Sequence, residues 1–277
     1  MARKMRRENS KSGGHRGNGR SSESHQGELL YGRQPVREMF LAERRRVFRL
    51  YLSETVKPTA ELNEILSMAG KADVMISRLS VRELDALVGD VNHQGIIAAV
   101  DNYPYLPFDK LLEKITSLNE SPPLLLLLDH LEDPQNVGSL IRSAETAGVD
   151  GVIIPDRRAA SITPAVVRAS AGATEHVRVT QVTNLARTIE TLKKDGFWFA
   201  GLEATDDAKP HTQTDLTGSL GLVVGSEGSG IKRIIKEHCD YLIKLPLKGK
   251  IGSLNAGVSG AIALYEILRQ REKDCLK

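Results

Sequence analysis

The sequence predicts an α/β protein made of a small α/β unit and a larger domain with a mainly parallel sheet. In residues 124–245, short apolar runs alternate with helical patterns, as expected when parallel strands are joined by crossover helices. The run at 124–128 is unbroken leucine, which is typical of a strand covered on both faces. A segment with two prolines and no clear period, residues 101–107, separates this domain from the unit before it.

The composition fits a globular protein, because 40% of the 277 residues are hydrophobic and 26% are charged. No apolar run approaches the roughly 20 residues that a membrane helix needs, and the basic N-terminus lacks the apolar segment of a secretory signal. The two cysteines, Cys239 and Cys275, form neither a metal-ligand spacing nor a disulfide framework. We therefore expect a cytoplasmic protein without a membrane segment or a metal site.

Residues 1–27 form a basic tail. The tail carries seven basic residues and two glutamates, a net charge of +5, whereas the whole chain has a net charge of +3. It is rich in Gly, Ser, Asn and His and nearly lacks large apolar residues, so we expect it to be disordered. Such an arm either adds sequence-independent affinity for phosphate backbones or acts as a solubilising extension, and both interpretations stay open.

Residues 28–100 are predicted to form the small α/β unit. Ser80 is expected to cap one of its helices, and His93 is interpreted as a structural histidine. Nothing in the unit is arranged as a nucleophile, an acid/base pair or a metal site, so it is interpreted as a recognition or positioning module. The expected elements are helices around 36–40, 61–69 and 80–87, and strands at 47–52, 74–77 and 96–100.

A linker, residues 101–122, contains a short helical pattern and leads into the domain at 123–277. Ligands of open α/β sheets bind beyond the carboxyl ends of the strands, so the loops that follow strands are the candidate sites. The strands expected in this domain lie at 124–128, 151–154, 197–200, 221–224 and 241–245. The helices expected between them lie at 136–147, 164–171, 185–194 and 231–238.

The first candidate loop, residues 129–136, precedes a helix whose apolar stripe includes Leu140 and Ile141. Asn136 is placed to cap this helix, and Arg142 falls opposite the stripe, where the core does not need it. Taken alone, the pattern fits a capping asparagine and a solvated arginine as well as it fits a site.

The second candidate loop, residues 225–230, contains three glycines that let backbone N–H groups turn toward an anion or a cofactor. It matches neither the Walker spacing nor the G-x-G-x-x-G pattern of dinucleotide-binding proteins. Glu227 in this loop is also suited to interact with the dipole of the following helix. As an isolated glycine loop, the signal is weak.

The third candidate loop, residues 245–255, opens the last helix, and Ser253 and Asn255 lie where that helix begins. Small residues in its first turns allow another backbone or a ligand to approach closely. A capped and tightly packed helix is the simpler interpretation of this stretch alone. The helix carries an apolar stripe at helical spacing, formed by Val258, Ile262, Tyr265 and Leu268.

Together, these loops resemble, in order, the three motifs of the SpoU-type (TrmH) RNA 2′-O-ribose methyltransferases, which belong to the trefoil-knotted SPOUT class. Three ordered motifs, within about residues 123–270, are far more specific than any one of them. The departures are mild: Leu247 stands where methionine is common, and Ala256-Gly257 where a larger residue is usual. The motifs are DPQNVGSLIRSA at 133–144, VVGSEG at 223–228 and LPLKGKIGSLN at 245–255.

The unit at 28–100 resembles the ribosomal-protein-L30e-like substrate-binding domain, on the residues YGR at 31–33 and HQG at 93–95. In the family, that domain often precedes the catalytic one in enzymes that act on large-subunit ribosomal RNA. The resemblance is closest to the RlmB-like group, and it implies a guanosine of 23S rRNA near the peptidyl-transferase centre as the target. It also implies that the last segment threads a loop and that the enzyme is a homodimer, with each active site completed by the partner.

The resemblance implies S-adenosylmethionine as the cofactor and a ribose 2′-hydroxyl as the acceptor. Arg142 would contact the reacting ribose and its 3′-phosphate, Asn136 would hold Arg142 or the nucleotide, and Glu227 would orient Arg142 or the active-site loop. Ser253 and Asn255 would fix the phosphate and the arginine. Three residues would hold the cofactor through backbone groups and apolar contact with the adenine, namely Gly225, Leu245 and Leu254.

Other functions compete with this one. Within the class, a transfer-RNA ribose methyltransferase or a resistance methyltransferase on another rRNA site remains an alternative, although the simplest tRNA enzymes lack the N-terminal unit. An RNA-binding protein that has lost catalysis is a second alternative, against which the complete set of motif residues speaks. A nucleotide-binding oxidoreductase would need a glycine loop after the first strand, which residues 129–136 do not offer.

Overall fold

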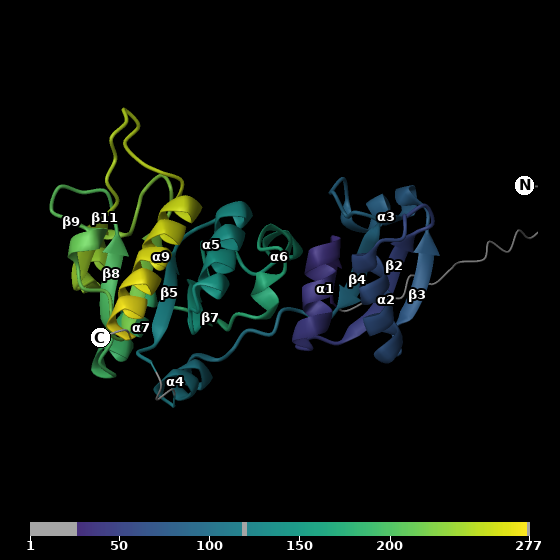
Figure 1. The fold of residues 1–277 in the computed structure, drawn as a ribbon, viewed down its shortest axis with the longest axis horizontal. Coiled ribbons are helices and arrows are strands. Elements are labelled where there is room, and N and C mark those ends of the chain that lie inside the picture. Colours follow the sequence, from purple (N-terminus) through teal and green to yellow (C-terminus); the bar gives the residue numbers. More distant parts are fainter. Residues whose placement is uncertain (1–26, 118–120, 276–277) are drawn as a thin grey trace, which may run out of the picture.

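The computed structural model describes residues 27–117 and 121–275 and contains two α/β units (Figure 1). The predicted basic tail, residues 1–27, lies outside the described residues except for Gly27. Figure 1 shows the N-terminal unit at one end and the larger unit at the other, with α6 (Pro164–Ala169) lying between α1 (Arg33–Ala42) and α5 (Pro134–Thr146). The two-unit α/β architecture predicted from the sequence is confirmed.

The N-terminal unit is built on a four-stranded sheet with strand order β1-β4-β2-β3. Its first strand was not predicted, because it has only four residues and runs directly into the pattern of α1. The predicted cap of α3 is confirmed, since the Ser80 side chain accepts from the Glu83 N–H while the Glu83 carboxylate accepts from the Ser80 N–H. The remaining elements are β1 (Glu28–Tyr31), β2 (Val47–Ser53), α2 (Ala60–Lys71), β3 (Met75–Leu79), α3 (Val81–Val88) and β4 (Ile96–Val100).

The larger unit is built on a seven-stranded sheet in which every strand pair is parallel, with the order β7-β6-β5-β10-β8-β11-β9. Two of its strands were not predicted: β7, which has four residues, and β9, which has two. The strands are β5 (Leu124–Asp129), β6 (Gly151–Pro155), β7 (Val179–Val182), β8 (Trp198–Leu202), β9 (Lys209–Pro210), β10 (Leu220–Gly225) and β11 (Tyr241–Lys244). The other helices are α4 (Phe108–Thr116), α7 (Leu185–Lys194), α8 (Arg233–His238), α9 (Ala256–Cys275), and the 3-10 turns η1 (Ala173–Glu175) and η2 (His211–Gln213).

The leucine run of β5 is buried on both faces of the sheet, as its composition predicts. Leu126 packs in the cluster that includes α5 and α9, whereas Leu127 packs in the cluster that includes α7 and α8. Leu111 and Ile115 of α4 belong to the second cluster, so the helical part of the predicted linker is packed against the seven-stranded sheet.

Two features of the helices differ from the sequence-based expectations. Asp133, not Asn136, caps α5, because Pro134 occupies the first helical position and moves the start of the helix forward. The apolar stripe of α9 does not face the core of its own chain: Val258, Ile262 and Tyr265 are 49%, 41% and 51% exposed. The side of α9 that packs against the core carries Gly260, Leu264 and Ile267 instead.

Polar contacts join the two units at a seam beside η1. Arg45, whose side chain is fully buried, pairs with Glu28 at 2.7 Å and with Glu175 at 2.9 Å. Burial raises the pKa of the Glu175 carboxyl, and Arg45 opposes that rise. The Tyr103 hydroxyl donates to the Thr174 carbonyl at 2.8 Å. These contacts fix the position of the N-terminal unit relative to the site.

No helix among the described residues is long and apolar enough to cross a membrane. Within the same residues, no group of three or more His, Cys, Asp or Glu side chains is arranged to hold a metal ion.

Candidate active site

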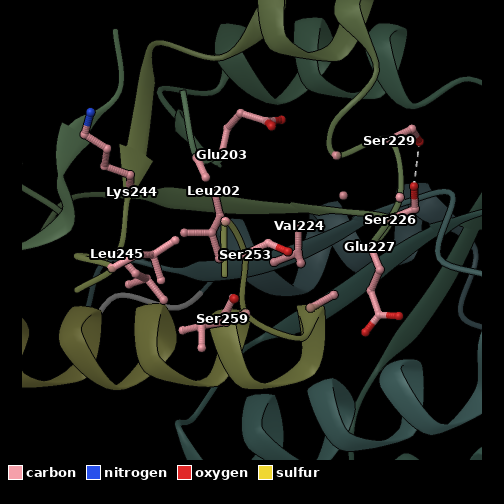
Figure 2. A pocket seen from close by; sticks show the side chains of 18 residues that line it. Leu202, Glu203, Val224, Ser226, Glu227, Ser229, Lys244, Leu245, Ser253 and Ser259 are labelled. Atoms are coloured by element: carbon pink, nitrogen blue, oxygen red, sulfur yellow. Dashed lines mark hydrogen bonds between the residues drawn. The ribbon is translucent and has the colours of Figure 1, made fainter. Parts of the chain in front are cut away.

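A pocket of about 370 Å³ lies at the carboxyl ends of β8, β10 and β11 (Figure 2). It falls within the range of small-molecule sites, roughly 300–1,000 Å³, and lies where open α/β sheets bind ligands. Its walls come from the ends of the three strands, the glycine loop after β10, the loop after β11 and the first turn of α9. The second and third predicted loops therefore meet at one pocket.

The glycine loop folds back on itself at the end of β10. Ser226 and Gly230 exchange two backbone hydrogen bonds, of 3.2 and 2.9 Å, and the hydroxyls of Ser226 and Ser229 lie 2.7 Å apart (Figure 2). A Cβ on Gly225 would lie only 2.2 Å from the carbonyl carbon of Gly230, so the turn requires glycine there. The N–H groups of Glu227, Gly228 and Ser229 donate to no other described residue, which leaves them available to a polar ligand.

Two carboxylates, which sequence reasoning did not single out, accept hydrogen bonds from the backbone just after this loop. Asp129, fully buried at the end of β5, accepts from the Lys232 N–H at 2.7 Å and pairs with the His130 ring. Glu203, just beyond β8, accepts from the Ile231 N–H at 3.0 Å and pairs with Lys236. An acidic residue that ends a fully apolar strand, as Asp129 does, is the signal that could have identified such a group.

The third loop supplies the apolar wall of the pocket. Leu245 and Leu254 line it together with Leu202 of β8, and Ser253 lies beside them (Figure 2). Apolar side chains on one side and free backbone donors on the other suit a ligand that has a flat ring and polar ends. Gly225, Leu245 and Leu254, which the resemblance assigns to the cofactor, line this one pocket, and so does Ser253, which it assigns to the phosphate and the arginine.

Asn255 joins the three motifs. Its side-chain amide donates to the Asn136 Oδ1 at 2.8 Å and also to the Glu227 carboxylate. Its own Oδ1 accepts from the Val258 N–H at 3.1 Å, which caps α9. Because Asn136 is the third residue of α5 rather than its cap, its side chain is free to receive this bond. One amide therefore links residues that lie 119 and 28 positions away in the chain.

Arg142 does not join this cluster within its own chain. It lies six residues after Asn136 on α5, which places it about 240° around the helix and about 9 Å along it. Its side chain is exposed and makes no hydrogen bond or ion pair with a described residue. It lines a groove beside α1, together with Gln34 and Glu145. Of the predicted site residues, Arg142 alone stands apart.

A second hollow, of about 420 Å³, adjoins the pocket on the other side of the glycine loop. The two share Ser226, Glu227 and Ser229, while Asn136 and Lys232 line the second hollow only. A ligand in the second hollow would therefore lie next to a ligand in the first, with the Asn136–Asn255–Glu227 cluster between them.

Comparisons with known proteins agree with this geometry. Residues 123–265 match the SpoU rRNA Methylase family, and residues 29–106 match the RNA 2′-O ribose methyltransferase substrate binding family. The chain is 39% identical over 243 residues to a protein of Staphylococcus saprophyticus assigned to the TrmH family of tRNA/rRNA methyltransferases, covering 88% of this chain and 96% of that one. A Bacillus subtilis protein with the same assignment, YacO, is 41% identical over 90% of this chain and 98% of its own.

Three crystal structures have a similar fold. The SpoU methyltransferase AviRb from Streptomyces viridochromogenes, in complex with the cofactor AdoMet, has a TM-score of 0.72 over 88% of this chain and 90% of that one, at 23% identity. An AdoMet-bound rRNA methyltransferase from Sinorhizobium meliloti has a TM-score of 0.71 over 88% and 87%, at 18% identity. The A. aeolicus TrmH/SpoU tRNA modifying enzyme covers only 60% of this chain and 86% of its own, with a TM-score of 0.51 at 25% identity. On the family match and the two relatives, the chain belongs to the SpoU/TrmH family of RNA 2′-O-ribose methyltransferases.

Proposed function

We propose that this enzyme uses S-adenosylmethionine to methylate the ribose 2′-hydroxyl of a guanosine in large-subunit rRNA, as RlmB-like enzymes do, and that it works as a homodimer. The observation that carries the proposal is the meeting of all three motifs at Asn255, beside a ligand pocket. The rRNA substrate is supported by the N-terminal unit, since the rRNA methyltransferase of Sinorhizobium matches nearly the whole chain and the tRNA enzyme of A. aeolicus matches little more than half.

The pocket residues fit S-adenosylmethionine. The leucines at 202, 245 and 254 provide apolar contact for an adenine ring, and the free N–H groups of the glycine loop provide donors for polar ends of the molecule. Glycine at 225 lets the glycine loop return close to the end of β10, because a Cβ there would collide with the backbone of Gly230 and Ile231. The cofactor supplies an electrophilic methyl group on its sulfonium, and the protein has to place the ribose hydroxyl in line with it.

We assign Arg142 the role of an electrostatic stabiliser rather than a base. A guanidinium is so weakly acidic that it stays charged at neutral pH, so it cannot take the proton of the 2′-hydroxyl. It can stabilise the negative charge that develops on the oxygen as the O–CH₃ bond forms, while the proton leaves to a phosphate of the RNA or to water. The hydrogen-bonded cluster of Asn136, Asn255 and Glu227 forms the polar surface against which the ribose is placed.

The homodimer is supported by the exposed face of α9. Val258, Ile262 and Tyr265 lie on one side of the helix and are 49%, 41% and 51% exposed, and in the loop before the helix Ile251 is 79% exposed. Exposed apolar side chains gathered on one helix face mark a protein–protein contact. A second copy is the occupant we propose, because it would also bring the missing Arg142 to the Asn136–Asn255–Glu227 cluster.

Introducing a charge on this face is expected to separate the dimer. An aspartate in Ile262→Asp would be buried without a partner in the interface, which destabilises association strongly. We expect a monomer by light scattering at micromolar concentration and a loss of methyl transfer of at least about a hundredfold. Ile234→Asp, at an isoleucine on α8 that is 54% exposed, is the control and should remain a dimer. A dimeric, active Ile262→Asp enzyme would contradict the assignment.

The substrate is tested by methyl transfer from labelled S-adenosylmethionine to unmodified large-subunit rRNA and to unmodified tRNA, side by side. We expect label in the rRNA, at the 2′-oxygen of one guanosine, and none with Arg142→Ala. Label in tRNA alone would contradict the rRNA substrate while leaving the chemistry in place. If neither RNA is labelled, an assembling ribosomal particle is the next substrate to test, and a negative result there would contradict the proposed function.

A further inference from the structure

The two sequence signatures of the N-terminal unit meet in the structure. Arg33, the first residue of α1, donates its backbone N–H to the Gln94 side-chain oxygen at 2.9 Å. The preceding Gly32 donates its N–H to the Ile96 carbonyl at 3.3 Å. The segments YGR at 31–33 and HQG at 93–95 therefore form one local structure, although they lie about sixty residues apart.

The turn that carries Gln94 is held in a costly conformation. Gln94 has a φ of 55°, in the left-handed region that non-glycine residues rarely adopt. His93 stabilises the turn, because its Nδ1 accepts from the Gly95 N–H at 3.0 Å and its Nε2 lies 3.1 Å from the Asp85 carboxylate. Such outliers persist where the surrounding structure fixes them, and they are frequent at binding sites. The left-handed conformation of Gln94 places its side-chain amide where it accepts from the Arg33 N–H.

Arg33 itself is held by neutral groups. Its Nη1 donates to the Thr59 hydroxyl at 3.1 Å, and its buried Nε has no hydrogen-bond partner. No described carboxylate lies within ion-pairing distance of it, whereas Arg37, one turn further along α1, pairs with both Glu38 and Glu64. The charge of Arg33 is therefore fixed in place and uncompensated.

A second uncompensated guanidinium reaches the same place from the catalytic unit. Arg168, at the end of α6, crosses the backbone of Gly32 so closely that a Cβ there would lie 3.0 Å from the Arg168 Nε. Glycine tolerates this approach because it has no Cβ, and the φ of 93° at Gly32 also favours glycine. Arg168 pairs with no described carboxylate either. Arg33 directly follows Gly32, so each unit contributes one arginine without a counter-charge at this point of the backbone, and such charges favour the binding of an anion.

A groove that is lined by residues close in sequence to Arg33 and Arg168 also includes Arg142. This groove, of about 420 Å³, runs between α1 and α5, and it is lined by Gln34, Ser170 and Arg142. Gln34 directly follows Arg33 in the chain, and Ser170 lies two residues after Arg168. The groove also contains two carboxylates, of which Glu38 is already paired with Arg37 and His176 while Glu145 is free to repel an anion.

We propose that Arg33 and Arg168 form a phosphate clamp that binds the backbone of the substrate RNA where the strand passes from the N-terminal unit to the catalytic unit. The clamp deepens the proposed function and rests on it. Guanidinium groups suit this role because their planar fork donates two hydrogen bonds to a phosphate. One side chain from each unit would hold the strand in register with the groove that leads to Arg142.

The test is RNA binding by Arg33→Gln and Arg168→Gln, measured with an rRNA transcript at several salt concentrations. Each variant should bind roughly tenfold more weakly, and the slope of log affinity against log salt should fall by about one. Affinity for S-adenosylmethionine and the melting temperature should stay unchanged in Arg168→Gln, because no described residue relies on that side chain. Arg187→Gln on α7 is the control, because Arg187 is exposed and likewise has no carboxylate partner among the described residues, and this variant should bind like wild type.

Arg168→Gln decides the outcome if Arg33→Gln unfolds. Wild-type affinity and an unchanged salt slope in Arg168→Gln would overturn the clamp, and methylation by the wild-type enzyme would then leave the proposed function standing. If the wild-type enzyme methylates no RNA, the proposed function is contradicted. The clamp is then contradicted too, because it is proposed to bind the RNA substrate of that function.

Discussion

Arg142→Lys is expected to slow methyl transfer by about a hundred- to a thousandfold, although it preserves the positive charge. Lysine presents a compact ammonium in place of a planar fork, so it cannot donate to the ribose oxygen and the adjacent phosphate together. Because Arg142 lies outside the cofactor pocket of its own chain, affinity for S-adenosylmethionine should be unaffected. Single-turnover rates with saturating RNA and cofactor measure the effect.

The matched control for this change is Arg187→Lys, which makes the same substitution on α7 and should keep the wild-type rate. Turnover close to wild type in Arg142→Lys would contradict the role of the fork. A loss confined to RNA affinity, with an unchanged single-turnover rate at saturation, would assign Arg142 to binding and remove it from the chemistry.

Gly225→Ala is expected to weaken cofactor binding. The added Cβ would lie 2.2 to 2.4 Å from backbone atoms of Gly230 and Ile231, so the glycine loop has to move. That loop cannot move freely, because Asp129 and Glu203 hold the chain just beyond it through the N–H groups of Lys232 and Ile231. Overpacking of this kind costs about 1–3 kcal/mol, and we expect at least about a tenfold rise in the Kd for S-adenosylmethionine by calorimetry.

Gly249→Ala is the control for Gly225→Ala. Gly249 belongs to the third motif, but a Cβ there meets no atom within 4 Å, and the residue does not line the pocket. Its cofactor affinity should equal that of wild type. If Gly225→Ala is folded by circular dichroism and binds the cofactor normally, the pocket is not the cofactor site.

Much of the fold followed from local patterns in the sequence. The unbroken leucine run predicted that β5 is buried on both faces of the sheet, and it is. The apolar period predicted α7, which spans Leu185–Lys194. The parallel sheet followed from the alternation of strands and helices. Strands of two to four residues, such as β9 and β1, carry too few residues for a period to be recognised.

The site was less predictable, because its decisive contacts join residues that are distant in sequence. The Asn255 amide reaches Asn136 across 119 positions, and local capping rules alone had placed Asn136 at the start of a helix that Asp133 actually caps. The sequence predicted the apolar stripe of α9 but could not tell whether the stripe packs against the core or is exposed, because the same spacing occurs in both cases. The approach of Arg168 to the backbone of Gly32 could not be predicted from a pattern, because it depends on how the two units pack.

The most direct test of the account is complementation between two impaired variants, assayed with S-adenosylmethionine well below its Kd for Gly225→Ala. Arg142→Ala and Gly225→Ala are co-expressed with different tags and assayed for methyl transfer as a mixture. If Arg142 acts in the partner's site, each mixed dimer has one intact site, and random pairing restores about a quarter of wild-type activity. If Arg142 acts within its own chain, no mixed dimer has an intact site. Restored activity in purified mixed dimers is the predicted result, and inactivity of folded, purified mixed dimers would contradict the shared active site.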